Sequence, residues 1–158
     1  MVNASPTFCD VQPAGLWLKA LFLAIAAGSF ALVGVNTGAA AGLAFAAFAL
    51  GFLFRCLRVE VQRETVSVRF GPGWPRRTIE LSRVIGVRTV RNRWWYGFGI
   101  RYTPHGWLWN LDGLDAVELD LPDGKRFRIG TRVPDELCAA IAAARELGST
   151  PSPDAPTA

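Results

Sequence analysis

The chain has 158 residues, a formal net charge of +4 and a mean hydropathy of +0.23. This length suits one ordinary domain with short additions, and it excludes a large multidomain enzyme. Hydrophobic residues make up 51% of the chain, and their excess lies almost wholly between Leu16 and Leu57. The composition therefore predicts two regions that face different surroundings.

Two apolar runs near the start predict a transmembrane helical hairpin. The run 16–35 carries Lys19 as its only charge, and a helix of about twenty residues reaches about 30 Å, the thickness of a bilayer's hydrocarbon core. After the polar pair Asn36-Thr37, a second run of similar length covers 38–57. We therefore expect two membrane spans, at about 16–35 and 38–57.

The positions of lysine and arginine set the expected orientation of this hairpin. The connector between the runs has neither residue, whereas Arg55, Arg58 and Arg63 follow the second run closely. Positively charged segments tend to remain in the cytoplasm. The sequence thus predicts a protein of the bacterial inner (cytoplasmic) membrane, with residues 1–15 as an N-terminal cytoplasmic segment and both termini cytoplasmic.

Residues 59–131 change to short alternating runs broken by Gly, Pro and Asp, which is typical of an antiparallel sheet. The clearest turn is Asp123-Gly124, because a two-residue hairpin needs positive φ at its centre. Around it, Val117 and Leu119 are expected to face inward, opposite Phe127 and Ile129. The expected strands are 59–64, 65–70, 77–82, 84–90, 98–102, 107–109, 116–121 and 125–131.

The last predicted element is a helix over 134–148. Pro134 suits the first helical position, and Gly148 can close the helix. Apolar residues recur at three- and four-residue steps, which gives one stripe to pack on the sheet. They are Leu137, Ala140, Ile141 and Ala144. The tail 149–158 lacks apolar material to fold and is expected to be disordered.

Four stretches in the second half of the chain carry a family resemblance: GFGIRYTPHGWLWN, GLDAVELDL, DGKRFRIGT and VPDELCAAI. Together they resemble the bacterial PH-like (pleckstrin-homology-like) domain family of small membrane proteins, most of them of undescribed function. The matching residues are Gly97, Gly99, Ile100, Arg101, Gly106, Trp107, Gly113, Val117, Asp123, Gly124, Phe127, Ile129, Gly130, Thr131 and Pro134.

This resemblance covers roughly the last two thirds of the folded part. It implies an α+β fold in which residues 58–148 form a PH-like antiparallel β-barrel or sheet capped by one C-terminal helix. It also implies a scaffold or assembly role, and it provides no catalytic motif.

Arginine and tryptophan are concentrated between residues 76 and 101, where Glu80 is the single acid. The negative cytoplasmic leaflet attracts Lys and Arg, and tryptophan favours the bilayer interface. We therefore expect a surface that contacts the membrane or a partner, and no nucleic acid. Its members are Arg76, Arg77, Arg83, Arg88, Arg91, Arg93, Trp94, Trp95 and Arg101.

The six tryptophans are expected to divide between core and surface. Half of them are assigned to the core, with Trp107 as the candidate because Gly106 and Leu108 flank it. Trp94 and Trp95 are neighbours, so on a strand they point to opposite faces and at most one is core.

The residues that could carry chemistry do not suggest an enzyme. His105, the sole histidine, sits in a TPHG turn and is interpreted as a loop residue. An acidic run is interpreted as mostly solvated: Asp112, Asp115, Glu118, Asp120 and Asp123. We expect no catalytic residue, no metal and no cofactor. Convergence of His105 with Asp112 or Asp115 in a closed pocket would revive an enzyme hypothesis.

Small residues one turn apart mark one face of each apolar run. They are Ala20, Ala24 and Gly28 in the first run and Gly38, Gly42 and Ala46 in the second. This spacing lets helix backbones approach closely. Such faces can close the hairpin upon itself or bind another transmembrane helix.

These features favour a non-catalytic, membrane-anchored interaction module, an accessory or assembly subunit of a larger membrane protein complex. Membrane lipids, a membrane-protein partner and self-association are the expected contacts. The alternative is an anionic-lipid-binding membrane sensor domain that uses the arginine and tryptophan surface. A small enzyme is the third hypothesis.

Overall fold

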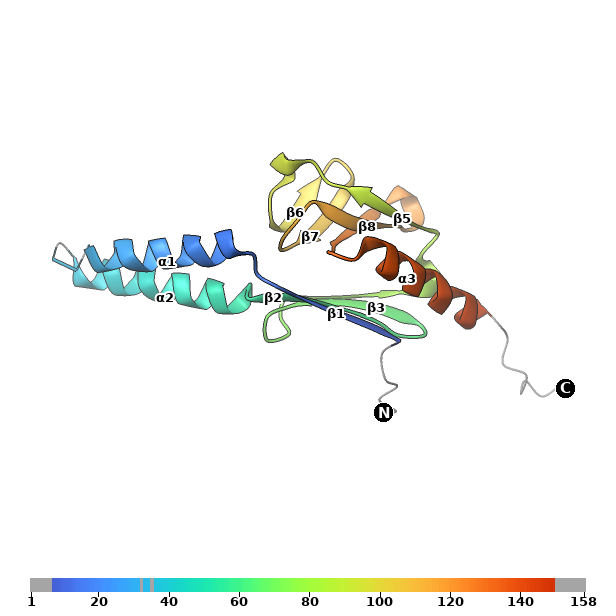
Figure 1. Ribbon diagram of the computed structural model, residues 1–158, viewed down its shortest axis with the longest axis horizontal. Coiled ribbons are helices and arrows are strands. Elements are labelled where there is room, and N and C mark those ends of the chain that lie inside the picture. The colour runs from blue at the N-terminus through green and yellow to red at the C-terminus, as the bar shows by residue number, and fades with distance from the viewer. Residues whose placement is uncertain (1–6, 32, 35, 150–158) are drawn as a thin grey trace, which may run out of the picture.

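The chain forms two β-sheets, a C-terminal helix and a helical hairpin that projects away from both sheets (Figure 1). This computed structural model describes residues 7–31, 33, 34 and 36–149. The first sheet contains, in spatial order, β1 (Phe8–Pro13), β2 (Cys56–Val61), β3 (Thr65–Phe70) and β4 (Arg76–Glu80). Its neighbouring strands are all antiparallel.

The alternation of side chains explains β2 and β3. Every second residue of each strand is buried, which is the period expected when one face of a sheet covers a core. The two strands pair with Val61 opposite Val66, so the hairpin predicted from this segment is confirmed.

Strand β1 lies within the predicted N-terminal segment, where the sequence pattern predicts no strand. Its inward positions include Asp10 and Gln12, and Gln12 is 1% exposed, whereas Val11 is 45% exposed. The Gln12 amide donates hydrogen bonds to Asp10 Oδ2 at 2.9 Å and to the carbonyl oxygen of Gly130 at 3.1 Å. Polar residues therefore face inward, so the segment lacks the apolar alternation that predicts a strand.

The second sheet has the spatial order β5-β8-β9-β7-β6. Its strands are β5 (Gly86–Arg91), β6 (Gly99–Thr103), β7 (Gly106–Asn110), β8 (Asp115–Asp120) and β9 (Arg126–Gly130). The turn at Asp123-Gly124 is confirmed, with φ of 63° and 68°. All pairs are antiparallel except β7 and β9, which are parallel. The prediction of one antiparallel barrel or sheet is therefore corrected to two sheets, one of them mixed.

Short 3-10 helices connect some of the strands. They are η1 (Leu81–Arg83) after β4, η2 (Trp94–Tyr96) after β5 and η3 (Pro122–Gly124) after β8. The long helix α3 (Pro134–Ser149) follows β9, as predicted, and Leu137, Ile141 and Ala144 are buried along its inner face. The predicted disordered tail lies outside the described residues, apart from the last residue of α3.

The main core lies between the two sheets and α3. Trp109 is 6% exposed and packs between two rings, with centroids 5.5 Å from Phe70 and 5.8 Å from Phe127. The assignment of Trp107 to the core is wrong, because this ring is 42% exposed at the start of β7. Trp109 is the buried tryptophan among the six, so the expected half is also wrong.

Two apolar helices form the hairpin, α1 (Leu16–Ala31) and α2 (Thr37–Leu53). They contain 16 and 17 residues. At 1.5 Å per residue these helices reach roughly 24 and 26 Å, less than the bilayer core of about 30 Å. Among the described residues, no helix combines the length and apolar character that crossing a membrane requires.

The predicted spans 16–35 and 38–57 are therefore wrong, as are the transmembrane hairpin and the inner-membrane location with cytoplasmic termini that depended on them. Local signals shorten the helices. Asn36 caps α2 by accepting a hydrogen bond from the Ala39 amide at 3.0 Å. At the other end the chain leaves the helix after Leu53, because Cys56 already begins β2.

Candidate interaction site

The two helices of the hairpin contact each other through small residues of α2. Ala40 and Ala47 are 3% and 4% exposed, and Ser29 is the buried residue of α1. A side chain at Gly51 would lie 3.4 Å from the Phe22 ring. The spacing of seven and four residues along α2 places its contact residues on one face.

The small residues singled out in the sequence do not form this contact. All six are exposed: Ala20, Ala24, Gly28, Gly38, Gly42 and Ala46. A Cβ atom added at Gly28 or Gly42 would meet nothing within 4 Å. The structure therefore places both faces on the outside of the hairpin, and binding of another helix there stays a prediction.

Large apolar side chains cover the rest of the outer surface of the hairpin. Phe30, Phe45 and Phe48 are 82%, 73% and 72% exposed. Lys19 is the only charged residue in either helix. Contiguous apolar surfaces of this kind mark sites that contact another molecule, since exposed apolar area is unfavourable in water by about 25 cal/mol per Å².

Both sheets hold the base of the hairpin. The Ala14 amide donates a hydrogen bond to the carbonyl oxygen of Arg55 at 2.9 Å, which continues the pairing of β1 with β2. The Trp17 ring packs on Phe98, the residue just before β6 of the second sheet, with centroids 4.7 Å apart. The hairpin therefore leaves the body of the protein in a defined direction (Figure 1).

The predicted arginine and tryptophan surface is spread over both sheets. Arg76 and Arg77 lie on β4, and Arg83 ends η1. Arg88 and Arg91 lie on β5.

The remaining members follow along the second sheet. Arg93 precedes η2, which contains Trp94 and Trp95, and Arg101 lies on β6. The nine residues therefore do not converge on one site.

Carboxylates neutralise part of the positive charge of this surface. Arg88 pairs with Glu118 and lies 3.4 Å from an oxygen of Asp120. Arg91 lies 4.0 Å from Asp115. Arg88 is therefore part of the ion pairing within the sheet, and both arginines are less available to an external anion.

The segment around η2 forms an aromatic cluster, which we define as Arg93, Trp94, Trp95, Tyr96 and His105. The Arg93 guanidinium lies 4.9 Å from the centre of the Trp95 ring. Trp94 and Trp95 are 75% and 56% exposed and meet edge to face, with centroids 5.8 Å apart. Tyr96 approaches His105 at 6.1 Å. The cluster presents apolar rings beside a cation.

A buried ion network joins three strands of the second sheet. Glu118 is fully buried, opposite Arg88 on β5 and Arg128 on β9. It accepts hydrogen bonds from both guanidinium groups, and Arg128 also donates one to Asn92 Oδ1 at 3.1 Å. Burial raises the pKa of Glu118, but these hydrogen bonds and charges outweigh it and hold the pKa below its ordinary value.

Glu118 is therefore an exception to the interpretation of the acidic run as mostly solvated. In the structure Glu118 lies opposite Arg128 on the neighbouring strand, whereas a strict two-residue turn at Asp123-Gly124 would pair it with Ile129. The alternation of residues along β8 also does not indicate that the face carrying Glu118 is buried, because that depends on how the rest of the chain packs.

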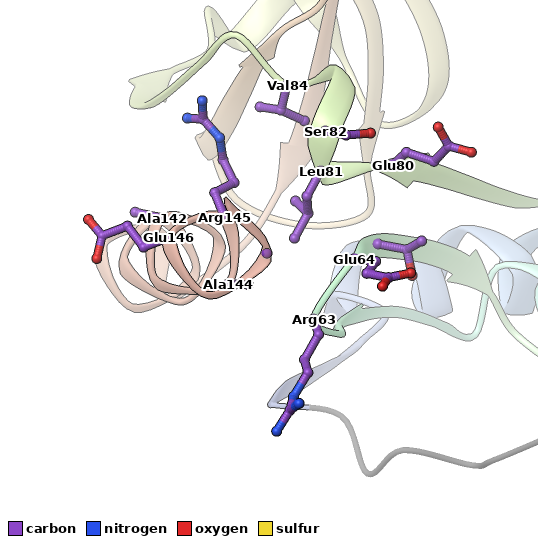
Figure 2. A pocket seen from close by; sticks show the side chains of 12 residues that line it. Arg63, Glu64, Glu80, Leu81, Ser82, Val84, Ala142, Ala144, Arg145 and Glu146 are labelled. Carbon is purple, nitrogen blue, oxygen red and sulfur yellow. The ribbon is translucent and has the colours of Figure 1, made fainter. Parts of the chain in front are cut away.

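A first cavity of about 790 Å³ lies between α3, η1 and the turn after β2. Figure 2 shows Arg145 and Ala144 of α3 on one side of it, with Glu64 and Arg63 across from them. Leu81 supplies an apolar wall. Charges of both signs surround this cavity, so it does not select an anion or a cation.

A second cavity, of about 670 Å³, lies where β4 of the first sheet faces two turns of the second sheet. Arg77, Tyr102, His105, Trp107 and Lys125 contribute to its lining. Of the predicted surface residues, it contains Arg77 alone. Sequence reasoning did not single out this combination, because it needs the packing of one sheet against the other.

The residues considered for catalysis are engaged elsewhere. Asp112 pairs with Arg132, and Asp115 lies beside Arg91. His105 lines the second cavity, and neither carboxylate does. The convergence that would revive the enzyme hypothesis is therefore not formed by these three residues.

Comparison of the sequence with protein-family models and with curated proteins found no match.

Proposed function

We propose that the protein is a non-catalytic interaction module, an accessory or assembly subunit that binds an apolar helix of a partner protein through the outer faces of its hairpin. The observation that carries this proposal is the exposure of Phe30, Phe45 and Phe48 on helices whose only charge is Lys19. Burial of such side chains against a partner stabilises a complex by about 1.5 to 3 kcal/mol for each fully covered ring.

The shape of the hairpin favours a helix as the bound element. Gly28 and Gly42 leave open space on the outer faces, between large exposed side chains. Small residues let another helix backbone come close, while the neighbouring rings pack on its sides. The fixed base of the hairpin, with Trp17 against Phe98, presents these faces without a large loss of conformational freedom on binding.

The resemblance to bacterial PH-like domains supports the same role, since such domains occur as scaffolds and in assembly factors. Two sheets capped by α3 are compatible with that resemblance. The family assignment remains part of the proposal.

Crosslinking from the hairpin tests the proposal. A photoreactive phenylalanine analogue at position 45 of the full chain, expressed in its own cells, is expected to crosslink to one apolar helix of a different protein. The purified partner is then expected to bind the wild-type chain, and Phe45→Ser with Phe48→Ser is expected to weaken the dissociation constant at least about tenfold.

The matched control is Trp74→Ser. Trp74 is 71% exposed, similar to Phe45, but it lies in the loop between β3 and β4. This control is expected to bind as the wild type does. Crosslinks only between copies of this chain, or equal losses in the hairpin and control variants, would contradict the proposal.

The aromatic cluster favours a second candidate function, contact with anionic lipid headgroups. Trp94 and Trp95 can enter a lipid surface while Arg93 faces phosphate groups, and each arginine near such a surface contributes about 1 kcal/mol. In flotation assays, binding to phosphatidylcholine liposomes is expected to rise about fivefold when phosphatidylglycerol is added. The variant Arg93→Gln and high salt should each reduce this increase.

The apolar hairpin gives a built-in reference for this assay, because its contribution does not depend on lipid charge. Equal binding to both kinds of liposome would therefore exclude the second candidate and leave the first intact. Arg76→Gln, an exposed arginine on the other sheet, is the matched control.

A further inference from the structure

The second cavity has walls that are fixed by short contacts. In the turn between β6 and β7, Thr103 Oγ1 donates to the carbonyl oxygen of Gly106 at 2.9 Å and accepts from the His105 amide at 3.2 Å. Gly106 has φ of +97°, and a Cβ atom there would lie 2.1 Å from the Arg126 carbonyl oxygen. Only glycine fits, so this turn is held against the start of β9.

Positive charge dominates the lining of this cavity. Arg77, Lys125 and Arg126 are the cations, against Asp123 as the acid. Lys125 lies 3.7 Å from Asp123, and Arg126 lies 3.4 Å from Asp120 outside the lining. Arg77 remains without a carboxylate in the part of the chain that the structure describes. The cavity therefore holds an excess of one unneutralised guanidinium.

The Arg77 side chain is also partly removed from water. Its guanidinium lies 4.7 Å from the centre of the Phe127 ring, which is fully buried beneath it. Burial lowers the pKa of Arg77 below its ordinary value. A bound anion would replace the hydration that the Arg77 guanidinium loses on burial, because a charge in a low dielectric interacts more strongly with an opposite charge.

Two aromatic rings complete the wall of the cavity. Tyr102 and Trp107 meet edge to face with centroids 5.5 Å apart, and they are 74% and 42% exposed. An aromatic ring of a ligand could add further contacts of this kind, since offset and edge contacts between rings contribute about 0.5 to 1.5 kcal/mol beyond area burial. The exposed faces suit a planar group.

We propose that the second cavity binds a small organic anion with a planar ring, whose carboxylate pairs with Arg77 while the ring packs on Trp107 and Tyr102. The forked donors of a guanidinium match the two oxygens of a carboxylate. The volume of about 670 Å³ lies within the range of small-molecule sites. This site is separate from the hairpin, so it adds a ligand to the proposed protein partner.

The test uses the full chain and three probes, followed by chemical-shift changes of the tryptophan indole N–H groups. The first probe is 2-naphthoate, which has both ring and carboxylate. The second is 2-naphthol, which has the ring alone, and the third is acetate, which has the charge alone. We expect saturable binding of naphthoate with a dissociation constant in the millimolar range or tighter, and at least about tenfold weaker binding of the other two.

Variants then locate the bound molecule. Arg77→Gln is expected to weaken naphthoate binding about tenfold, since a paired charge and its hydrogen bonds are lost. The matched control is Arg76→Gln on the same strand, where side chains alternate between the faces of the sheet. Tyr102→Ala, at a largely exposed residue, should weaken binding severalfold without unfolding the chain.

The outcomes separate clearly. Loss of naphthoate binding in Arg77→Gln and Tyr102→Ala, with Arg76→Gln unchanged, supports the site. Equal affinity for naphthoate and naphthol, equal losses in the Arg76 and Arg77 variants, or no saturation at about 10 mM would overturn it. The folded state of each variant is checked by the dispersion of its amide signals.

Discussion

Replacement of Trp109 by alanine is expected to lower the free energy of unfolding by about 4 kcal/mol, because it removes a large ring from a closed core. The ring is 6% exposed, and it joins Phe70 of the first sheet to Phe127 of the second. The cavity left behind would separate the two sheets at their main aromatic contact. Most domains are stable by only about 5 to 15 kcal/mol, so this loss is large.

Urea denaturation followed by circular dichroism measures this effect. The matched variant is Trp107→Ala, two residues earlier on the same strand, where the ring is 42% exposed. Its expected loss is about 1 kcal/mol or less. A larger loss in Trp107→Ala than in Trp109→Ala would mean that the core has been assigned to the wrong tryptophan.

The second large effect is expected for Glu118→Gln, which should lower the free energy of unfolding by about 3 kcal/mol. Glutamine keeps the size of the side chain but removes the charge that both Arg88 and Arg128 require. Arg128 is itself buried, so it would keep an unpaired charge inside the sheet. The control is Glu80→Gln, because Glu80 is exposed at the end of β4.

The pH dependence gives an independent readout of the same network. The pKa of Glu118 is lower in the folded chain than its ordinary value of 4.5. Its stabilising contribution is therefore complete above about pH 5 and is lost as the pH falls through the lower, folded-state value. On acidification, Glu118→Gln should lose less unfolding free energy than the wild type does. The same loss in Glu118→Gln, Glu80→Gln and the wild type would contradict this account.

Local sequence signals were sufficient to predict much of the second sheet and the helix α3. The turn at Asp123-Gly124 needs positive φ at two residues, and few residue pairs other than Asp-Gly provide it. Likewise, the stripe of Leu137, Ile141 and Ala144 has the helical period and is buried as expected. In these elements the residues that form the structure are neighbours in the sequence.

The features that the sequence did not predict depend on distant segments. β1 is a strand because its backbone pairs with β2 and because Gln12 reaches Gly130, more than a hundred residues away. Trp107 and Trp109 share a strand, and Trp109 is the covered one because Phe70 of the first sheet packs on it. The apolar runs of the hairpin predicted helices correctly, but their lengths were set by Asn36 and by the start of β2.

The candidate sites also combine features that the local sequence predicts with features that depend on distant segments. The apolar character of the hairpin is visible in the sequence, whereas the outward position of its small residues is not. The second cavity combines Arg77 with Trp107, thirty residues apart and on different sheets. No local pattern reports such a juxtaposition, because it follows from the packing of the two sheets.

The hairpin occupies the connection between two strands that are paired with each other. Pro13 lies opposite Cys56, so the chain departs from and returns to adjacent positions in the first sheet. The two helices are therefore an insertion between paired strands, and the order of the strands in the sheets does not depend on them. Such an insertion can be lengthened, shortened or replaced without changing the order of the strands. Its sequence can therefore change to suit a binding partner while the two sheets keep their fold.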